Sequence, residues 1–117
     1  QYPERALFAR LVDAARAACD EHSVRFHIGR TFCTDTIAAQ FGHIDRIVQM
    51  GYDSLDMESA AAFKAANLLQ IPIAALLNVS DNSAAGKSLM TRRSEEEISR
   101  RRFVSREVMA NILSELL

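Results

Sequence analysis

The chain of 117 residues has an ordinary globular composition: 49% of its residues are hydrophobic, 25% are charged and the net charge is −1. These values exclude a disordered chain, and the charge balance gives no reason to expect nucleic acid or an anionic membrane as a partner. The longest apolar run, Ile71 to Leu77, is far shorter than the roughly 20 residues that cross a bilayer.

The first half of the chain alternates between helical and strand patterns. From Glu4 to Glu21, apolar residues recur at a helical period and charged residues occupy the opposite face. Residues Ser23 to Phe32 alternate and predict a strand. Residues 38–50 show a weaker helical pattern that ends at Gly51, and a short strand is expected from Tyr52 to Asp56.

The second half continues the alternation and ends in the best marked helix. A helix is expected from Met57 to Leu69, followed by a turn at Pro72. The continuous apolar run from Ile73 to Val79 predicts a strand that is covered on both faces. The final helix is expected to begin at Ser94, with Glu97 in the position that completes a capping box.

The order of these elements, α-β-α-β-α-β-α, predicts an α/β fold with a mainly parallel or mixed sheet and helices packed on it. Residues 1–117 are expected to form a single domain. Because the chain begins at Gln1, directly before a helical pattern, we interpret it as the C-terminal half of a larger domain.

The run "RRSEEEISRRR" in the final helix is strongly charged. We interpret it as a solvated helix face rather than a nucleic-acid patch. Glu96 with Arg100 and Glu97 with Arg101 would form i,i+4 ion pairs, each worth about 0.2–0.5 kcal/mol.

The two cysteines, Cys19 and Cys33, form no CxxC motif and have no histidine nearby at metal-binding spacing. We therefore expect reduced thiols, a cytoplasmic protein and no metal site.

Acidic residues lie at both ends of the predicted unit of strand, helix and strand. Asp56 and Glu58 follow the first strand, and Asp81 follows the second. A crossover of this type makes the two strands parallel, so their carboxyl ends share the edge where α/β sheets bind ligands. Glu58 in the first helical turn would stay ionised and accept hydrogen bonds from two hydroxyls of a sugar. Asp81, partly buried after an apolar strand, could donate a proton.

Two simpler interpretations stay open at these positions. Glu58 would then be only a helix-start charge, and Asp81 only a turn cap. A phosphate-binding P-loop at "DNSAAGKS" is excluded, because that motif needs glycine five positions before Gly86, where Asp81 stands.

Three motifs in order, "IGRTFCTDT", "LDMESAAAF" and "VSDN", resemble the nucleoside phosphorylase-I superfamily from about Ile28 to the end of the chain. The superfamily includes purine nucleoside phosphorylases, uridine phosphorylases and related nucleosidases. The resemblance implies that Glu58 binds the ribose 2′- and 3′-hydroxyls, with Asp56 beside it. It also implies that Met57 packs against the sugar, that Phe32 stacks near the base and that Asp81 protonates purine N7. For Met57 and Phe32, simple core packing is the alternative.

The activity that the resemblance implies is phosphate-dependent cleavage of purine-type ribonucleosides, which gives free base and ribose 1-phosphate. The enzyme would be a pentosyltransferase that uses inorganic phosphate as co-substrate and no cofactor. Its partners would be the small-molecule nucleoside and phosphate, and it would form a homo-oligomer of dimer units, a trimer or a hexamer. Arg92 or Arg93 would assist Asp81.

Departures from the family pattern keep other activities open. Asp56 resembles the "DMES" run of AMP nucleosidases, and Asn82 stands where purine phosphorylases often have histidine. The phosphate site of the family would precede Gln1, and Arg30 and Lys87 are isolated basic residues. The alternatives are a nucleosidase of the AMP or methylthioadenosine type, which uses water, and a non-catalytic nucleoside-binding module.

Overall fold

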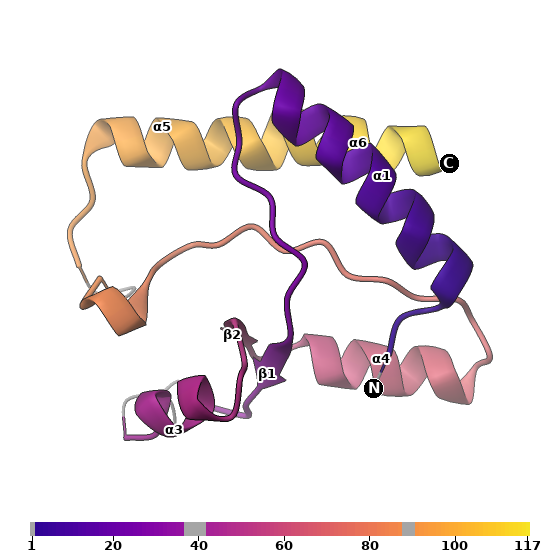
Figure 1. Cartoon of the computed structure of the whole chain (residues 1–117), viewed down its shortest axis with the longest axis horizontal. Coiled ribbons are helices and arrows are strands. Elements are labelled where there is room, and N and C mark those ends of the chain that lie inside the picture. Colours follow the sequence, from indigo (N-terminus) through magenta and orange to yellow (C-terminus); the bar gives the residue numbers. More distant parts are fainter. Residues whose placement is uncertain (1, 37–41, 88–90) are drawn as a thin grey trace.

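The computed structural model describes residues 2–36, 42–87 and 91–117. Its elements in chain order are α1 (Arg5–Glu21), β1 (Thr31–Cys33), α3 (Ile44–Gln49), β2 (Ser54–Asp56), α4 (Ser59–Leu68), the 3-10 turn η1 (Ser83–Ala85), α5 (Glu95–Phe103), the π-helical turn η2 (Val104–Val108) and α6 (Met109–Leu116). Figure 1 shows α1, α5 and α6 on one side of the molecule and β1, β2, α3 and α4 on the other.

Helix α1 forms as predicted, because both of its ends satisfy their free backbone groups. The Glu4 carboxylate accepts hydrogen bonds from the N–H groups of Ala6 at 2.9 Å and Leu7 at 2.7 Å. Both bonds lower the pKa of Glu4 below its ordinary value, and the bond from Leu7 has the larger effect. At the other end, Ser23 adopts a left-handed conformation with φ 53° and closes the helix.

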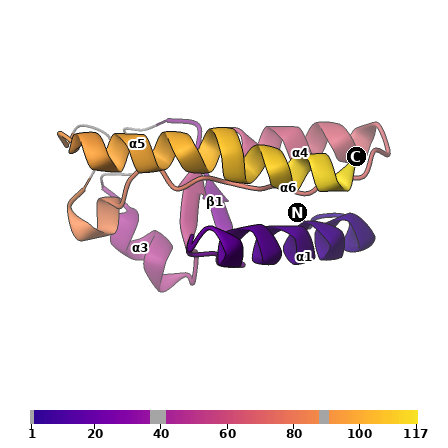
Figure 2. The same ribbon diagram turned by 90° about the horizontal axis from the view of Figure 1, so that it is seen from above.

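The C-terminal helix also begins as predicted. The Ser94 hydroxyl accepts from the Glu97 N–H at 3.1 Å, and the Glu97 carboxylate accepts from the Ser94 N–H at 3.0 Å, which completes the capping box. The helix then widens into η2 and continues as α6. Figure 2 shows the continuous run of α5 and α6 with α1 beside it.

The hydrophobic core lies between α1 and the run of η2 and α6. It consists of Leu11, Ala14, Ala15, Ala18, Cys19, Val108 and Ile112. Side chains of two extended connections, Val24 and Phe26 from one and Ala74 and Leu76 from the other, pack against this cluster. The apolar stripes that the sequence placed on these two helices are therefore the faces that meet.

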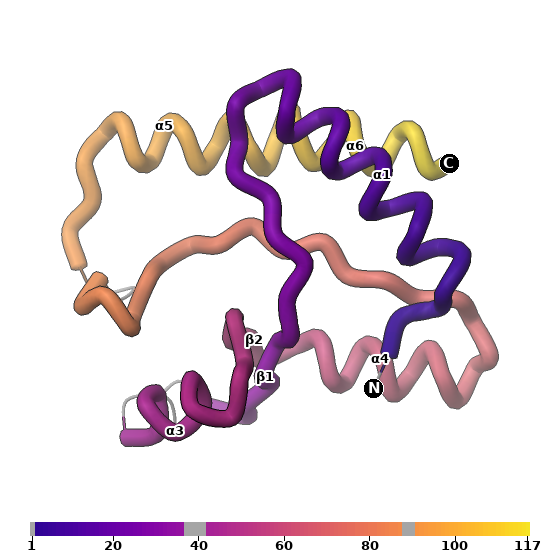
Figure 3. Tube along the Cα trace, viewed as in Figure 1, coloured from indigo at the N-terminus to yellow at the C-terminus, as the bar shows by residue number. Residues whose placement is uncertain are grey.

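The sheet is smaller than predicted. Strands β1 and β2 pair in parallel, with Phe32 opposite Leu55. Of the expected strand Ser23–Phe32, only the end pairs, and the expected strand Ile73–Val79 is wrong: this segment is extended but joins no sheet. A strand needs a neighbouring strand to pair with, and this segment has none: among the described residues, no backbone hydrogen bond involves residues 74–80. Figure 3 follows this segment as a single trace across the molecule.

The remaining helices flank the sheet. Helix α4 lies within the predicted range, and none of its residues is buried. Helix α3 covers only Ile44–Gln49 of the weak pattern predicted for residues 38–50, of which 38–41 lie outside the described residues. It ends at Gln49, two residues before the predicted stop at Gly51, where a φ of 79° favours glycine.

Candidate active site

The carboxyl ends of β1 and β2 meet at one edge. Cys33 lies opposite Asp56 in the register, and the Thr34 N–H donates to the Asp56 carbonyl oxygen at 2.9 Å. Met57 and Glu58 follow directly and begin α4. The predicted edge of parallel strands therefore exists, but β1 forms it with β2, whereas the sequence assigned the second strand to residues 73–79.

Asp56 holds the start of α4. Its Oδ1 accepts from the Ser59 hydroxyl at 2.8 Å, and its Oδ2 accepts from the Ser59 N–H at 3.2 Å. Sequence reasoning missed Ser59, although an acid followed three residues later by serine at a helix start is a typical capping pattern. The Asp56 carboxylate is thus engaged within the protein, and its role with substrate stays a prediction.

Glu58 has a far more open carboxylate. It is exposed and occupies the N-cap position of α4, but its side chain does not cap the helix. Its Oε2 accepts only from the Met57 N–H, at 3.2 Å. Met57 itself is 38% exposed. The carboxylate therefore retains the lone pairs that a pair of hydroxyls would need.

Phe32 contacts a second aromatic residue that the sequence reasoning missed. Its ring meets Tyr52 edge to face, with 5.3 Å between the centroids. The Arg30 guanidinium lies 4.6 Å from the centroid of the same tyrosine. The Asp53 carboxylate accepts from the Arg30 N–H at 2.8 Å, which ties the beginnings of the two strands together. Phe32 is thus a half-buried ring held at the small sheet, and its contact with a base stays a prediction.

Asp81 is half-buried and is surrounded by hydroxyls. Its Oδ1 accepts from Ser80 Oγ at 2.8 Å, and its Oδ2 accepts from Ser83 Oγ at 3.1 Å. Sequence reasoning assigned no role to these serines, although "SDNS" places a hydroxyl close to the acid on both sides. Each carboxylate oxygen keeps a second lone pair that is free for a proton or a ligand.

A tight turn follows Asp81. Asn82 and Lys87 exchange two backbone hydrogen bonds of 2.8 and 2.9 Å, and Asn82 Oδ1 accepts from the Ala85 N–H at 3.1 Å. Gly86 completes the turn with φ 72°. This turn is closed by its own backbone, in keeping with the exclusion of a P-loop at this position.

The predicted site residues fall into two groups. Phe32, Asp56, Met57 and Glu58 belong to the β1–β2 unit and the start of α4, whereas Asp81 ends the extended segment. Across residues 2–36, 42–87 and 91–117, no hydrogen bond or ion pair links Asp81 to the first group. How the two groups approach a common ligand stays a prediction.

Of the two arginines considered as helpers of Asp81, Arg93 is the more notable. It is half-buried, whereas Arg92 is exposed. The Nη2 atom of Arg93 is buried and has no hydrogen-bond partner in the described part of the chain. A buried guanidinium nitrogen without a partner is costly, so a polar partner is expected there in the working protein.

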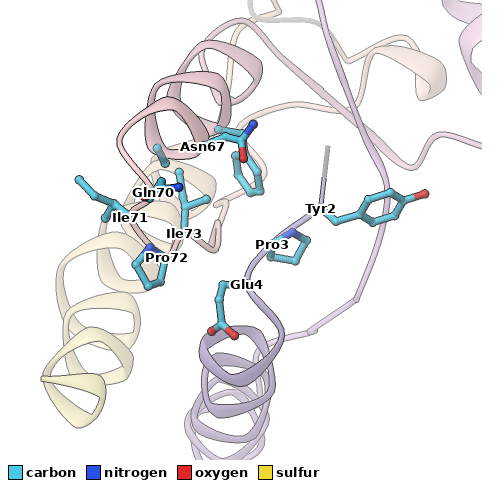
Figure 4. Close-up of a pocket in the computed structure, with 10 residues that line it drawn as sticks. Tyr2, Pro3, Glu4, Asn67, Gln70, Ile71, Pro72 and Ile73 are labelled. Atoms are coloured by element: carbon cyan, nitrogen blue, oxygen red, sulfur yellow. The ribbon is translucent and has the colours of Figure 1, made fainter.

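A surface pocket of about 400 Å³ lies elsewhere, between the N-terminal segment and the end of α4 (Figure 4). It is lined by Tyr2, Pro3, Glu4, Phe63, Ala66, Asn67, Gln70, Ile71, Pro72 and Ile73. None of the predicted site residues lines it. Its carboxylate, Glu4, already caps α1. The pocket therefore offers no free acid for chemistry.

The charged run of the last helix differs from the prediction. The pairs Glu96–Arg100 and Glu97–Arg101 do not form. Instead, Lys87 Nζ lies 3.7 Å from Glu97 Oε1, and these two residues form the ion pair found among the described residues. Arg100 donates to the carbonyl oxygens of His22 and Ser23 at 3.2 and 2.9 Å. It therefore joins the two long helices, because free carbonyls at the end of α1 attract a guanidinium.

Two further properties bear on function. In the described residues, no group of three His, Cys, Asp or Glu side chains is arranged to hold a metal ion. None of the helices seen there combines the length and the apolar character that crossing a bilayer requires.

Comparison with known proteins agrees with the three sequence motifs. The family described as the phosphorylase superfamily matches residues 2–117. No curated protein and no solved structure matches the chain. Because the match covers almost the whole chain, and because the mixed structure with a small parallel sheet is consistent with it, the chain belongs to the phosphorylase superfamily, a family of enzymes that act on nucleosides as phosphorylases or hydrolases.

Proposed function

We propose that this protein cleaves the N-glycosidic bond of purine-type ribonucleosides with inorganic phosphate, as a purine nucleoside phosphorylase-like pentosyltransferase. The observation that supports it most is that a member of this family carries two carboxylates in different environments. Glu58 is open at the end of a parallel strand, and Asp81 is half-buried among hydroxyls. These environments suit a sugar-binding acid and a proton-handling acid, respectively.

In this reaction the bond between ribose C1′ and the base nitrogen breaks, and its electron pair goes to the base. A phosphate oxygen bonds to C1′ and gives ribose 1-phosphate. A proton supplied through Asp81 at purine N7 neutralises the base as it leaves, which stabilises the transition state more than the bound substrate. Glu58 orients the sugar through its 2′- and 3′-hydroxyls.

Arg93 is the residue that we propose to assist Asp81. Its Nη2 atom has no partner in the described part of the chain, and it would find an acceptor in the developing negative charge of the base or in phosphate. Met57, Asp56 and Phe32 would complete the walls around the nucleoside.

The test is nucleoside turnover by the intact protein, with and without inorganic phosphate. We expect Asp81→Ala to lower kcat by about 10²–10⁴-fold, the usual contribution of general acid catalysis. Glu58→Ala should instead remove the preference for ribonucleosides over 2′-deoxyribonucleosides. Glu115→Ala, at an exposed position of α6, is the matched control and should behave as wild type.

The outcomes separate the proposed activity from its alternatives. Turnover without phosphate, releasing free ribose, would identify a nucleosidase. Binding of inosine or adenosine in calorimetry without any turnover would identify a nucleoside-binding module. Wild-type turnover in Asp81→Ala would contradict the acid role.

We also propose a cytoplasmic homo-oligomer, formed of dimer units, a trimer or a hexamer. Large apolar side chains are exposed at the end of α4, Leu68 (74%) and Leu69 (69%), and in the extended segment, Val79 (74%). Exposed apolar groups of this size are typical of surfaces that are covered in an assembly. Analytical ultracentrifugation of the intact protein tests this, and a monomer at micromolar concentration would contradict it.

A further inference from the structure

The extended segment that ends at Asp81 is tied to the C-terminal helix by one side chain, that of Asn78. Its Nδ2 donates to the Ser105 hydroxyl at 2.8 Å and to the Arg101 carbonyl oxygen at 3.3 Å. An amide NH₂ carries two hydrogens, so both bonds can form at once. Both acceptors belong to the region where α5 passes into the π-helical turn η2.

Little else fixes this segment in place. No backbone hydrogen bond involves residues 74–80 within the described ranges. The side chains of Ala74 and Leu76 pack against the core cluster, but such contacts have no direction and tolerate sliding. Ser80, the neighbour of Asp81, bonds only to the Asp81 carboxylate itself in the described structure. The directional contact before Asp81 that reaches the C-terminal helix is that of Asn78, three residues earlier in the chain.

On the far side of Asp81, η1 lies close to α3, and the described link toward α5 is weak. Lys87 forms its ion pair with Glu97 at 3.7 Å, and the two side chains are 69% and 50% exposed. A pair so exposed is screened by water and contributes little to position. The turn that carries Asp81 therefore depends on the Asn78 side for its placement relative to α5.

The helical end of this contact is unusual. A π-helical turn is rare and commonly marks a functional position, because it displaces the residues of one turn from the regular helix. Here η2 contains Ser105, and it buries Val108 in the core. The Ser105 hydroxyl is exposed, but it belongs to a helical turn whose Val108 is buried in the core.

We propose that Asn78 is a positioning residue for Asp81: it anchors the extended segment to η2 and so sets where the Asp81 carboxylate lies. The consequence for catalysis rests on the proposed function, whereas the anchoring itself does not. A displacement of a reacting group by about 1 Å can cost about 100-fold in rate, so loss of this anchor should be visible in turnover.

Turnover by the intact protein tests the catalytic part. Asn78→Ala should lower kcat by about 10- to 100-fold, with KM changed by less than about threefold, because the sugar contacts of Glu58 are untouched. Ser105→Ala removes one of the two bonds and should lower kcat less. The double variant should match Asn78→Ala, because Asn78→Ala already removes the bond to Ser105. In an Asp81→Ala background, Asn78→Ala should have no further effect on kcat. If Asn78→Ala only destabilised the protein, it would still lower kcat in that background.

Hydrogen exchange tests the anchoring without any activity. The amides of Asn82 and Lys87, bonded to each other's carbonyl groups, should exchange faster in Asn78→Ala, while amides in α1 keep their wild-type rates. Asn111→Ala, an exposed asparagine on α6 whose side chain makes no hydrogen bond in the described structure, is the matched control and should change neither exchange nor kcat.

The two failures are distinguishable. If Asp81→Ala is inactive but Asn78→Ala keeps wild-type kcat and exchange, the positioning role is wrong and the proposed function stands. If the wild-type protein cleaves no nucleoside, the proposed function is wrong, and exchange at Asn82 and Lys87 still decides whether Asn78 anchors the turn.

Discussion

The two sides of the molecule are stabilised in different ways. The helical side, made of α1, η2 and α6, contains nearly all the buried residues of the described structure, and Ile112 and Val108 are 1% exposed. The sheet side carries the candidate site, yet α4 has no buried residue and each strand covers only three residues. On the helical side apolar burial dominates, and on the sheet side a few directional hydrogen bonds hold the functional residues.

This difference explains why the candidate acids lie where they do. A packed core tolerates few polar groups, because each one needs a partner when it is buried. The ends of short strands and the turn after an extended segment impose no such limit, so carboxylates and serines can be placed there freely. The helical side then acts as the support to which Asn78 and Arg100 attach the rest.

The largest effect on stability is expected in the core of the helical side. Ile112→Ala should lower the free energy of unfolding by about 2–5 kcal/mol, because it leaves a cavity between α1 and α6. Its neighbour Leu113, 49% exposed, provides the control, and Leu113→Ala should cost about 0.5 kcal/mol or less. Urea unfolding measures both, and equal losses would contradict the dominance of apolar burial in this core.

A smaller effect is expected at the start of α4. Asp56→Ala removes both bonds to Ser59 and should cost about 1 kcal/mol, the usual value of a capping side chain. Asp56→Asn keeps an acceptor and should retain most of the stability. Asp35→Ala, which changes an exposed acid without a side-chain bond in the described structure, is the control. A loss at Asp35 as large as at Asp56 would contradict the capping role.

A gain of stability is expected at the end of α4. Gln70 adopts φ 54°, a left-handed conformation that costs a residue with a Cβ about 1 kcal/mol. Gln70→Gly should therefore raise the free energy of unfolding by about 0.5 kcal/mol after the greater chain entropy of glycine is included. Ser23→Gly at the end of α1 is the counterpart on the helical side. A loss at either position would show that the side chain contributes more than the strain.

The smallest effect is expected from pH. Main-chain hydrogen bonds lower the pKa of two glutamates. For Glu4 the strongest effect comes from the N–H of Leu7, and for Glu97 it comes from the N–H of Ser94. A lowered pKa in the folded state gives stability that is present above the ordinary pKa and is lost as the pH falls through the folded value. The melting temperature should therefore decline below about pH 4.5. The decline should be shallower in Glu4→Gln and Glu97→Gln, and an unchanged slope would contradict the link.

Local features were predictable from the sequence. The cap at Ser94, the stop before Gly51 and the buried stripe of α1 all depend on residues within a few positions of each other. Their physics is contained in the neighbouring side chains and backbone groups, so a short window is sufficient.

The strands were predicted less well, because a strand depends on its partner. The alternation in residues 23–32 and the apolar run in 73–79 describe chains that can pair, but only Thr31–Cys33 finds a partner, in Ser54–Asp56. The bonds of Ser59 to Asp56 and of Ser83 to Asp81 are local, and the sequence patterns around both acids could have revealed them.

The sequence by itself determined the family, the helices and the identity of the acids, since motifs and helical periodicity are properties of nearby residues. Only the tertiary structure decided which strands share an edge. It also decided that Arg100 bonds to the end of α1 and not to Glu96, and that Asn78 joins the Asp81 segment to η2. These contacts link residues far apart in the chain, and their geometry follows from how the helices pack, which no local pattern specifies.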